Sequence, residues 1–386
     1  MANHDLAAVV AAFQIEGAFL DAAPHGSGHI NDTYASRVRT ARGIARYVHQ
    51  RINDRIFKDP VRLMDNIARV TAHLRRKIVT AGGNPDRETL TVVPARDGSP
   101  LHRDDAGGFW RTYLFLEGAR TYDVVSSADT AESAAGAFAR FQKMLSDLPA
   151  PRLTETIPGF HDTPRRVAAL RAAIASDVAG RAAEAARDIH QALAWADRSG
   201  TLMDLARRGL VPERITHNDT KFNNVMIDDA TGRGLAVIDL DTVMPGLSVV
   251  DFGEMVRTGA NPAPEDQRDL SEVRLDLAMF EPLARGYVSA AREFLTPLEL
   301  DHLAYAAMLM TYENAVRFLT DHLSGDTYYK IHRPGHNLDR CRAQFALLAD
   351  MERQAERMQT IVNRYRTDRP AIRPTGRGPG MQSEPE

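Results

Sequence analysis

The chain of 386 residues is long enough to form two lobes around a sizeable core, and its 44 % hydrophobic and 26 % charged residues are typical of a globular protein. Its 48 lysine and arginine residues against 51 acidic residues give a formal net charge of -3, so no general basic field attracts nucleic acid or anionic lipid. The N-terminal residues lack a signal-peptide pattern, and no apolar run reaches about 18 residues. We therefore expect a cytoplasmic protein that binds neither nucleic acid nor a membrane.

The first third of the chain predicts a small sheet interrupted by one long helix. Short strands are expected near residues 33–38, 45–52, 90–94 and 109–116. A helix should follow Pro60, because apolar residues recur from there at every third or fourth position. This apolar stripe consists of Val61, Met64, Ile67, Val70, Leu74 and Ile78.

Helical patterns dominate the rest of the chain. Continuous helices are expected at 131–145, 167–196 and 298–323. The single cysteine, Cys341, excludes an internal disulfide and is expected to be a small core residue on a helix. The last residues are rich in proline, glycine and charge, which predicts a disordered tail. The sequence therefore predicts an α+β protein with a sheet-rich lobe, a helical lobe and a tail, at residues 1–117, 118–366 and 367–386.

One hairpin is expected inside the helical part, with strands at 222–227 and 235–240. It follows the string ITHNDTKFNNVMI, in which His217, Asp219 and Asn224 have the spacing H-x-D-x-x-x-x-N. Kinase-type phosphoryl transfer needs a carboxylate that orients the acceptor hydroxyl and, a few residues later, an amide oxygen for magnesium. Asp219 and Asn224 fit these two roles.

The expected register of the hairpin provides a second magnesium ligand. Its turn is predicted to be centred between Thr231 and Gly232. In that register Asn224 and Asp239 face each other, with Cβ atoms about 5 Å apart. Two oxygen ligands at this separation can share one Mg²⁺ ion. Asp241 would point to the same side of the strand, where it could serve a second metal or orient a water ligand.

A structural role is the alternative for each of these residues. Asp219 would then cap a turn, His217 would satisfy buried carbonyl groups, and the two hairpin aspartates would face solvent. For Asp251 the structural role is favoured, although the letters Asp-Phe-Gly match a kinase metal motif. It follows a turn that leaves the strand, so we expect it to brace the loop past Pro245.

A glycine-rich segment ahead of the first predicted strand is the candidate phosphate cradle. Gly26, Ser27 and Gly28 occur in HGSGHINDTY, and the chain has no G-x-x-x-x-G-K-[ST] loop to serve instead. A simple turn before the strand is the alternative.

Four strings together resemble a known group of enzymes: GSGHINDTY, THNDTKFNNVMID, VIDLDTVMPGLSVVDFGEMVRTGAN and YENAVRFLTDHLSGDTYYKI. They are similar to the aminoglycoside phosphotransferase and choline kinase superfamily and, within it, to the N-acetylhexosamine 1-kinases. The resemblance implies a protein-kinase-like fold with ATP between the lobes and a sugar acceptor against the helical lobe. It also implies that Asp219 is the base and that Asn224 and Asp239 are the Mg²⁺ ligands. The implied reaction moves the ATP γ-phosphoryl group to the anomeric hydroxyl of N-acetylglucosamine or N-acetylgalactosamine.

The resemblance also suggests sugar contacts. His29 and Asn31 of the glycine segment and Arg317 and Tyr328 of the helical lobe are the candidates. For Arg317 an ion pair with Asp321, one helical turn further along, is an equally good expectation.

The chain departs from the superfamily on its third strand, where a lysine or arginine usually holds the phosphates. The string RYVHQRIN offers Gln50 or Arg51 at this place, and strand alternation sends these two side chains to opposite faces. At most one of them can therefore reach the nucleotide. The helix acid expected to pair with it is Asp65.

Two other functions remain open on the sequence. A kinase of the same fold could act on an aminoglycoside or choline, but such cationic acceptors call for a strongly acidic site, and the acidic excess in residues 261–365 is mild. A nucleotide-binding scaffold without turnover is the other possibility. The sequence does not distinguish ATP from another donor and leaves the oligomeric state open.

Overall fold

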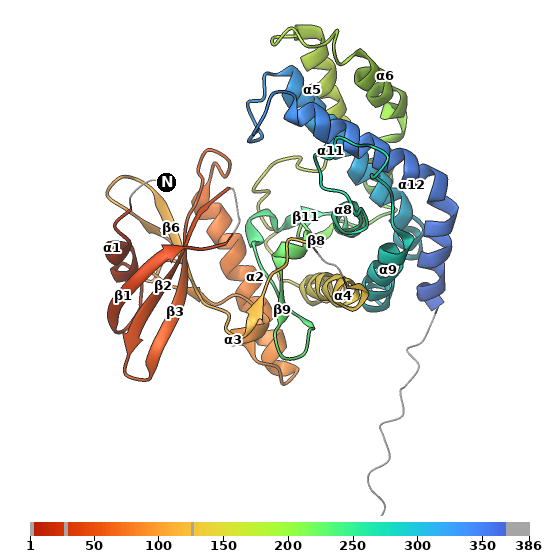
Figure 1. Cartoon of the computed structure of the whole chain (residues 1–386). Coiled ribbons are helices and arrows are strands. Elements are labelled where there is room, and N and C mark those ends of the chain that lie inside the picture. Colours follow the sequence, from red (N-terminus) through yellow and green to blue (C-terminus); the bar gives the residue numbers. More distant parts are fainter. Residues whose placement is uncertain (1–3, 27–29, 125–126, 368–386) are drawn as a thin grey trace, which may run out of the picture.

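The computed structural model describes residues 4–26, 30–124 and 127–367. The chain forms a sheet-rich lobe and a larger helical lobe, seen in Figure 1 as red to orange and yellow to blue. This is the two-lobed α+β architecture that the sequence predicts. The predicted tail lies outside the described residues, apart from Thr367 at the end of the last helix.

The sheet lobe is built on an antiparallel sheet in the order β1, β2, β3, β6, β4, with β5 also paired to β6. The four predicted strands are present as β2, β3, β4 and β6. The strands β1 and β5 were missed, because every residue of β1 is exposed or half-buried and β5 has only two residues. The bounds of the strands, and of the helix α1 that precedes them, are α1 (Leu6–Ala11), β1 (Ala18–Pro24), β2 (Asp32–Thr40), β3 (Gly43–Arg51), β4 (Val92–Val93), β5 (His102–Arg103) and β6 (Phe109–Leu114).

The predicted long helix is α2 (Pro60–Thr80), followed by the short α3 (Pro85–Glu88). Asp59 caps α2, because its carboxylate accepts a hydrogen bond from the N–H of Arg62 at 3.0 Å. The predicted stripe is buried except for Val61, which is 59 % exposed, and Leu63 takes its place in the core. The helix lies between the sheet and the helical lobe (Figure 1).

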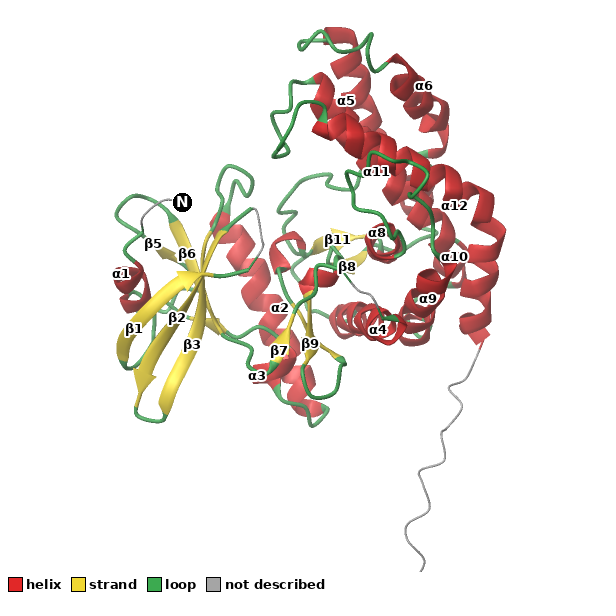
Figure 2. Ribbon diagram, viewed as in Figure 1, coloured by secondary structure: helices red, strands yellow, loops and turns green. Residues whose placement is uncertain are grey.

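The helical lobe contains two small sheets: one with β8 and β11 near α8, and one with β7 and β9 at the edge of the lobe between α2 and α4 (Figure 2). Helix α4 packs on α9, and α11 packs on α8 and α12. Cys341 is buried in α12, as expected. None of the helices in the described part of the chain is long and apolar enough to cross a membrane. The helices are α4 (Ala128–Leu145), α5 (Thr163–Ser176), α6 (Ala186–Trp195), α7 (Thr201–Arg207), α8 (Ser248–Gly259), α9 (Leu277–Ala291), α10 (Pro297–Asp301), α11 (Leu303–Leu323) and α12 (His336–Thr367).

Two helices that the sequence predicts as continuous are divided. The helix expected at 167–196 separates into α5 and α6, because Asp177 adopts a left-handed conformation with φ of 36°. Its carboxylate then accepts the N–H groups of Arg181 and Ala182. The helix expected at 298–323 is interrupted at His302, between α10 and α11.

The two small sheets hold the segment predicted to carry the chemistry. One has the order β10, β9, β7, and the other pairs β11 with β8. β7 comes directly after the sheet lobe and already pairs with β9 of the helical lobe. Their bounds are β7 (Ala119–Arg120), β8 (Arg214–Thr216), β9 (Val225–Asp228), β10 (Gly234–Val237) and β11 (Met244–Gly246).

Candidate active site

The hairpin of β9 and β10 exists, but its register differs by one residue from the prediction. Val225 pairs with Val237, so Asn224 lies opposite Ile238, whose N–H donates to the Asn224 carbonyl at 2.9 Å. The turn is not symmetric, because Asp228 accepts the N–H of Thr231, and the register shifts again towards the turn. The predicted cross-strand pair of Asn224 and Asp239 is therefore wrong.

Asp239 nevertheless lies next to Asn224, because it directly follows Ile238. Its backbone is left-handed, with φ of 55°, at the start of the 3₁₀ turn η3 (Leu240–Thr242). The Asn224 side chain donates through Nδ2 to the carbonyl and the carboxylate of Asp219, at 2.8 and 3.2 Å. Its Oδ1 atom is thus left to accept or to ligate. The structure brings Asp219, Asn224 and Asp239 together, as the motif spacing predicts.

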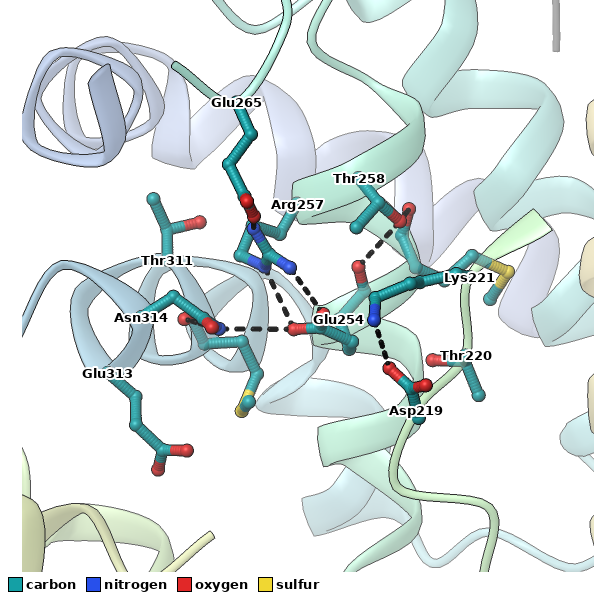
Figure 3. Close-up of polar contacts among 12 residues, drawn as sticks. Asp219, Thr220, Lys221, Glu254, Arg257, Thr258, Glu265, Thr311, Glu313 and Asn314 are labelled. Atoms are coloured by element: carbon teal, nitrogen blue, oxygen red, sulfur yellow. Dashed lines mark hydrogen bonds and ion pairs between the residues drawn. The ribbon is translucent and has the colours of Figure 1, made fainter. Parts of the chain in front are cut away.

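Asp219 is held as a carboxylate by Lys221, whose Nζ lies 2.8 Å from Oδ1 (Figure 3). Partial burial would raise the pKa of Asp219, but the charge and hydrogen bond of Lys221, together with His217 and Asn224, outweigh it and place the pKa below its usual range. His217 connects this loop to the hairpin: its Nδ1 accepts the Asp219 N–H at 3.3 Å, and its Nε2 donates to the Ile238 carbonyl at 2.8 Å. The carboxylate is therefore ionised and fixed beside Asn224 and Asp239.

Asp251 of α8 supports the same loop from behind. Its carboxylate accepts the N–H groups of His217 and Asn218 at 2.8 and 2.7 Å, and Gln142 donates to it as well. The expected structural role is seen, although Asp251 braces the loop before the hairpin and not the loop past Pro245.

His161 provides another brace, which sequence reasoning missed. Its Nε2 lies 2.9 Å from the Asn218 carbonyl and its Nδ1 lies 2.8 Å from a carboxylate oxygen of Glu313 in α11. Both partners are acceptors, so the ring must donate from both nitrogens and is an imidazolium. Burial lowers the pKa of His161, but the charge and hydrogen bond of Glu313 and the Asn218 carbonyl together outweigh it, so the pKa is raised. The second Glu313 oxygen accepts from Thr163 at 2.7 Å.

A comparison with known proteins identifies the family of this arrangement. The model of the APH family, described as a phosphotransferase enzyme family, matches residues 21–284, which is more than half of the chain. The chain belongs to this family. It is a phosphotransferase, and the match covers both the glycine segment and the Asp219 motif.

Solved structures with the same fold include kinases of small molecules. A microcompartment-associated aminopropanol kinase has a TM-score of 0.53 at 14 % identity, with 92 % of this chain and 98 % of that chain covered. Choline kinase from Cryptosporidium parvum Iowa II has a TM-score of 0.53 at 11 % identity, with 94 % and 99 % covered. An aminoglycoside phosphotransferase from Alicyclobacillus acidocaldarius has a TM-score of 0.52 at 15 % identity, with 92 % and 98 % covered. At these identities the likeness concerns the fold, and it confirms the expected two-lobed kinase-like architecture.

Asp241 of this phosphotransferase is not available as the predicted metal helper. Its Oδ1 is in a buried ion pair with Arg111 of β6, and its Oδ2 accepts from Asn31 at 2.7 Å. The strand β10 ends at Val237, so Asp241 lies in the turn η3 and not on the strand. Its side chain reaches Arg111 of the sheet lobe and does not lie on one strand face with Asp239. The prediction missed Arg111 because its partner lies 130 residues away in the chain.

The strand β3, all of which is described, carries no unpaired cation on the face that holds Gln50, because Arg46 on that face is paired with Glu117. Gln50 accepts from the Nε of Arg111 at 2.9 Å and donates to Thr33 at 3.1 Å. Arg51 lies on the opposite face, beside Gly108. Asp65 does not pair with either, because its carboxylate is 57 % exposed and its ion pair is with Arg69, at 3.9 Å.

The predicted phosphate cradle is described only in part. Gly26 adopts φ of 78°, and a Cβ atom there would meet no atom within 4 Å. Ser27, Gly28 and His29 lie outside the described residues. Asn31 has partners at both ends of its amide, since its Oδ1 accepts the Asn53 N–H at 3.0 Å while its Nδ2 donates to Asp241. This bonding does not fit its predicted role as a sugar contact.

Arg317 lies in α11, six residues before the end of the helix, and Tyr328 lies in the loop after it. The Arg317 guanidinium lies 5.2 Å from the ring centre of Phe160 and 5.7 Å from that of Tyr329. The alternative ion pair with Asp321 is wrong, because the Asp321 carboxylate accepts backbone N–H groups of the loop, among them that of Tyr328 at 2.8 Å. Tyr328 is 60 % exposed.

A charged group on α8 faces Lys221, and sequence reasoning missed it too (Figure 3). Glu254 accepts from Arg257 at 2.9 and 2.5 Å and from Asn314 of α11 at 3.3 Å. Arg257 also donates to Glu265 at 2.9 Å. The sequence did contain a signal for this pair: Glu254 and Arg257 are three positions apart in the apolar string VVDFGEMVR. Charged residues that are buried with such a string need a partner of opposite charge.

The residues present fit a divalent cation held by few protein ligands. Within residues 4–26, 30–124 and 127–367, no three His, Cys, Asp or Glu side chains form a closed metal centre. Mg²⁺ does not require one, because it is usually bound by one or two protein oxygens together with phosphate and water. The Asp239 residue is exposed to solvent, but much protein lies around its carboxylate. Desolvation by this protein and the negative charges of Asp241 and Asp219 raise the pKa of Asp239 to about 7. This excess of negative charge favours a cation beside Asp239.

Proposed function

We propose that this phosphotransferase transfers the γ-phosphoryl group of ATP to the anomeric hydroxyl of an N-acetylhexosamine. The observation that carries the proposal is the position of Asp219, which is ionised, partly exposed and fixed next to Asn224 and Asp239. The three residues match the base and the two magnesium ligands of kinase-type transfer.

In the proposed mechanism Asp219 accepts a hydrogen bond from the acceptor hydroxyl and orients its oxygen for attack. The carboxylate takes the proton while the oxygen–phosphorus bond forms and the bond to the ADP oxygen breaks. Lys221 keeps Asp219 ionised before the transfer and places a positive charge beside the transferred group. Mg²⁺ held by Asn224 and Asp239 would neutralise charge on the phosphates.

The nucleotide is proposed to bind between the lobes, against the segment that contains Gly26. Gln50 lies on the face of the sheet shared with Arg111, but its amide is bonded at both ends, and Arg51 lies on the opposite face, so neither is proposed as a phosphate contact. Ser27 and Gly28 remain predicted contacts.

The helical-lobe side of Asp219 supports a neutral acceptor. Three acids near this side already have a cation: Asp219 is paired with Lys221, Glu254 with Arg257 and Glu313 with His161. A cationic acceptor such as choline would have to displace one of these partners. A sugar, by contrast, can exchange hydrogen bonds with such mixed polar groups.

Aromatic and cationic side chains around Arg317 of α11 suit a sugar ring. Arg317 and the exposed Tyr328 are proposed as contacts, with Phe160 as a stacking surface next to Arg317. His29 remains a predicted contact.

An acceptor panel tests the proposal. The purified protein is incubated with Mg²⁺ and ATP or GTP, and with N-acetylglucosamine, N-acetylgalactosamine, hexoses, choline, ethanolamine or aminoglycosides. We expect an N-acetylhexosamine to raise nucleotide turnover by about tenfold or more over the background without acceptor. ³¹P NMR should then locate the phosphate on the anomeric oxygen. Turnover with a cationic acceptor alone would disprove the acceptor assignment, and turnover with none would disprove the kinase function.

The Asp219→Asn variant tests the proposed base. We expect kcat to fall by about 10²- to 10⁴-fold with little change in thermal stability, because the amide cannot take the proton. The matched control is Asp197→Asn, at an exposed carboxylate of the same lobe, which should retain full turnover. Turnover of Asp219→Asn close to the wild-type rate would remove Asp219 from this role.

A further inference from the structure

A buried ion pair joins the two lobes beside the proposed magnesium site. Arg111 belongs to β6 of the sheet lobe and Asp241 to the turn η3 of the helical lobe. Their side chains are 1 % and 3 % exposed. The Arg111 guanidinium also donates to Gln50 and lies 4.0 Å from the sulfur of Met64 in α2. Its charge is therefore enclosed by groups from both lobes.

Asp241 is the point at which four segments meet. Both of its carboxylate oxygens have partners, Arg111 for Oδ1 and Asn31 for Oδ2. Its backbone carbonyl accepts from Thr156, in the loop before α5, at 2.8 Å. Asn31 in turn accepts the N–H of Asn53, which follows β3. Metal binding by Asp241 would require breaking the ion pair and would leave Arg111 charged and buried.

These contacts fix the backbone next to Asp239. On one side of Asp239, Ile238 is hydrogen-bonded to Asn224, and on the other side Asp241 is anchored. Asp239 between them has φ of 55°, a left-handed conformation that costs some free energy even for aspartate and that the contacts on both sides hold in place. The ion pair is one of these contacts.

Arg111 explains why the third strand has the neutral residue Gln50 where the superfamily usually has a cation. Gln50 is the direct cross-strand partner of Arg111 and accepts from its Nε. A lysine in its place would put a second positive charge next to Arg111 and would lose the acceptor. The guanidinium of β6 therefore requires a neutral side chain on β3.

We propose that Arg111 and Asp241 form a positioning clamp that joins the lobes and holds Asp239 beside Asn224, and that Asp241 takes no part in binding the metal. Its effect on catalysis rests on the function proposed above. Its effects on stability and on metal binding do not need an acceptor.

A double-mutant cycle tests the clamp. The variants Arg111→Gln, Asp241→Asn and their combination are compared by thermal unfolding and by EPR of Mn²⁺ in the presence of ATP. We expect each single variant to lower the unfolding temperature and the combination to lower it by less than the sum, because both charges are then removed. Arg111→Lys, which retains the charge, should recover part of the loss and provides a folded variant if the others are unstable.

Manganese binding separates a clamp from a ligand. With ATP present, Asp239→Asn should weaken Mn²⁺ binding by about tenfold or more. Arg111→Gln and Asp241→Asn should each weaken it less than Asp239→Asn does, and to a similar extent, because both release the clamp and neither removes a ligand. A loss in Asp241→Asn equal to that in Asp239→Asn, with Arg111→Gln close to the wild type, would make Asp241 a ligand and overturn the proposal. Additive losses of unfolding temperature would overturn it as well.

Kinetics and a Gln50 variant complete the test. With an active acceptor, the single variants should lower kcat more than they raise the KM for the acceptor, and the double variant should recover part of kcat. Gln50→Lys should lower the unfolding temperature more than Gln50→Met does, because both lose the acceptor for Arg111 but only the lysine adds a positive charge. Tighter ATP binding by Gln50→Lys with unchanged stability would contradict the clamp. If no acceptor supports turnover, the proposed function fails, while the unfolding and Mn²⁺ results still decide the clamp.

Discussion

His49 in the sheet lobe and His161 in the helical lobe are both enclosed by protein, yet only one of them is charged. His49 lies between the hydroxyl groups of Ser36 and Thr112, at 2.7 and 2.8 Å, and burial lowers its pKa to about 4. His161 lies between a carboxylate and a backbone carbonyl, and its pKa is raised. The first ring is therefore neutral and the second is an imidazolium.

The difference shows that the partner, and not the depth of burial, decides the charge. A hydroxyl group can donate or accept, so Ser36 and Thr112 satisfy a neutral ring in either tautomer. Glu313 can only accept and brings a negative charge, which compensates the desolvation of the imidazolium. The charged histidine is the one that supports the loop of Asp219.

Among the changes at the two histidines, removal of Glu313 should lower the stability of the protein the most. We expect Glu313→Leu to lower the free energy of unfolding by about 3–5 kcal/mol, because it leaves His161 buried without its counter-charge. Denaturant unfolding measures the loss. The combined variant His161→Leu/Glu313→Leu is the matched control and should lose less than Glu313→Leu alone. A larger loss in the combined variant would show that the ion pair is not the source of the effect.

The hydroxyl groups of Thr163, near His161, and Ser36, near His49, should contribute differently to the free energy of unfolding. Thr163→Val removes a donor to the Glu313 carboxylate and should cost about 1.5–3 kcal/mol of unfolding free energy. Ser36→Ala removes a hydrogen bond between neutral groups and should cost about 0.5–1.5 kcal/mol. Both are measured by the same unfolding experiment, and equal losses would argue against a charged Glu313.

The pH dependence of stability should have opposite signs at the two centres. The pKa of His161 is raised on folding, so its contribution is complete below about pH 6.5 and is lost as the pH rises through the folded-state pKa. The pKa of His49 falls to about 4, so its contribution is complete above about pH 6.5 and is lost as the pH falls towards 4. Each slope should not exceed about 1.4 kcal/mol per pH unit.

Unfolding of the wild type, His161→Gln and His49→Gln across pH 4 to 9 checks these signs. The difference from the wild type should shrink at high pH for His161→Gln and at low pH for His49→Gln. The same sign for both variants would contradict the assigned charge states.

Local patterns were sufficient for much of the fold and failed where a single backbone conformation decided the outcome. The strands β2, β3 and β6 and the helix α2 follow from alternation or from apolar spacing. The division of α5 from α6 depends on one left-handed residue, Asp177. The hairpin register depends on how Asp228 closes its turn, and a shift of one residue moved Asp239 out of the ladder.

The sequence by itself determined the cluster of Asp219, Asn224 and Asp239, because these residues are close in the chain and a hairpin returns the third to the first two. Only the tertiary structure decided that Asp241 pairs with Arg111 and that His161 pairs with Glu313, at separations of 130 and 152 residues. The physical reason is that a buried charge needs a partner, but local spacing cannot tell which distant segment supplies it. The nearby residues thus indicated the chemistry, and the distant ones hold it in place.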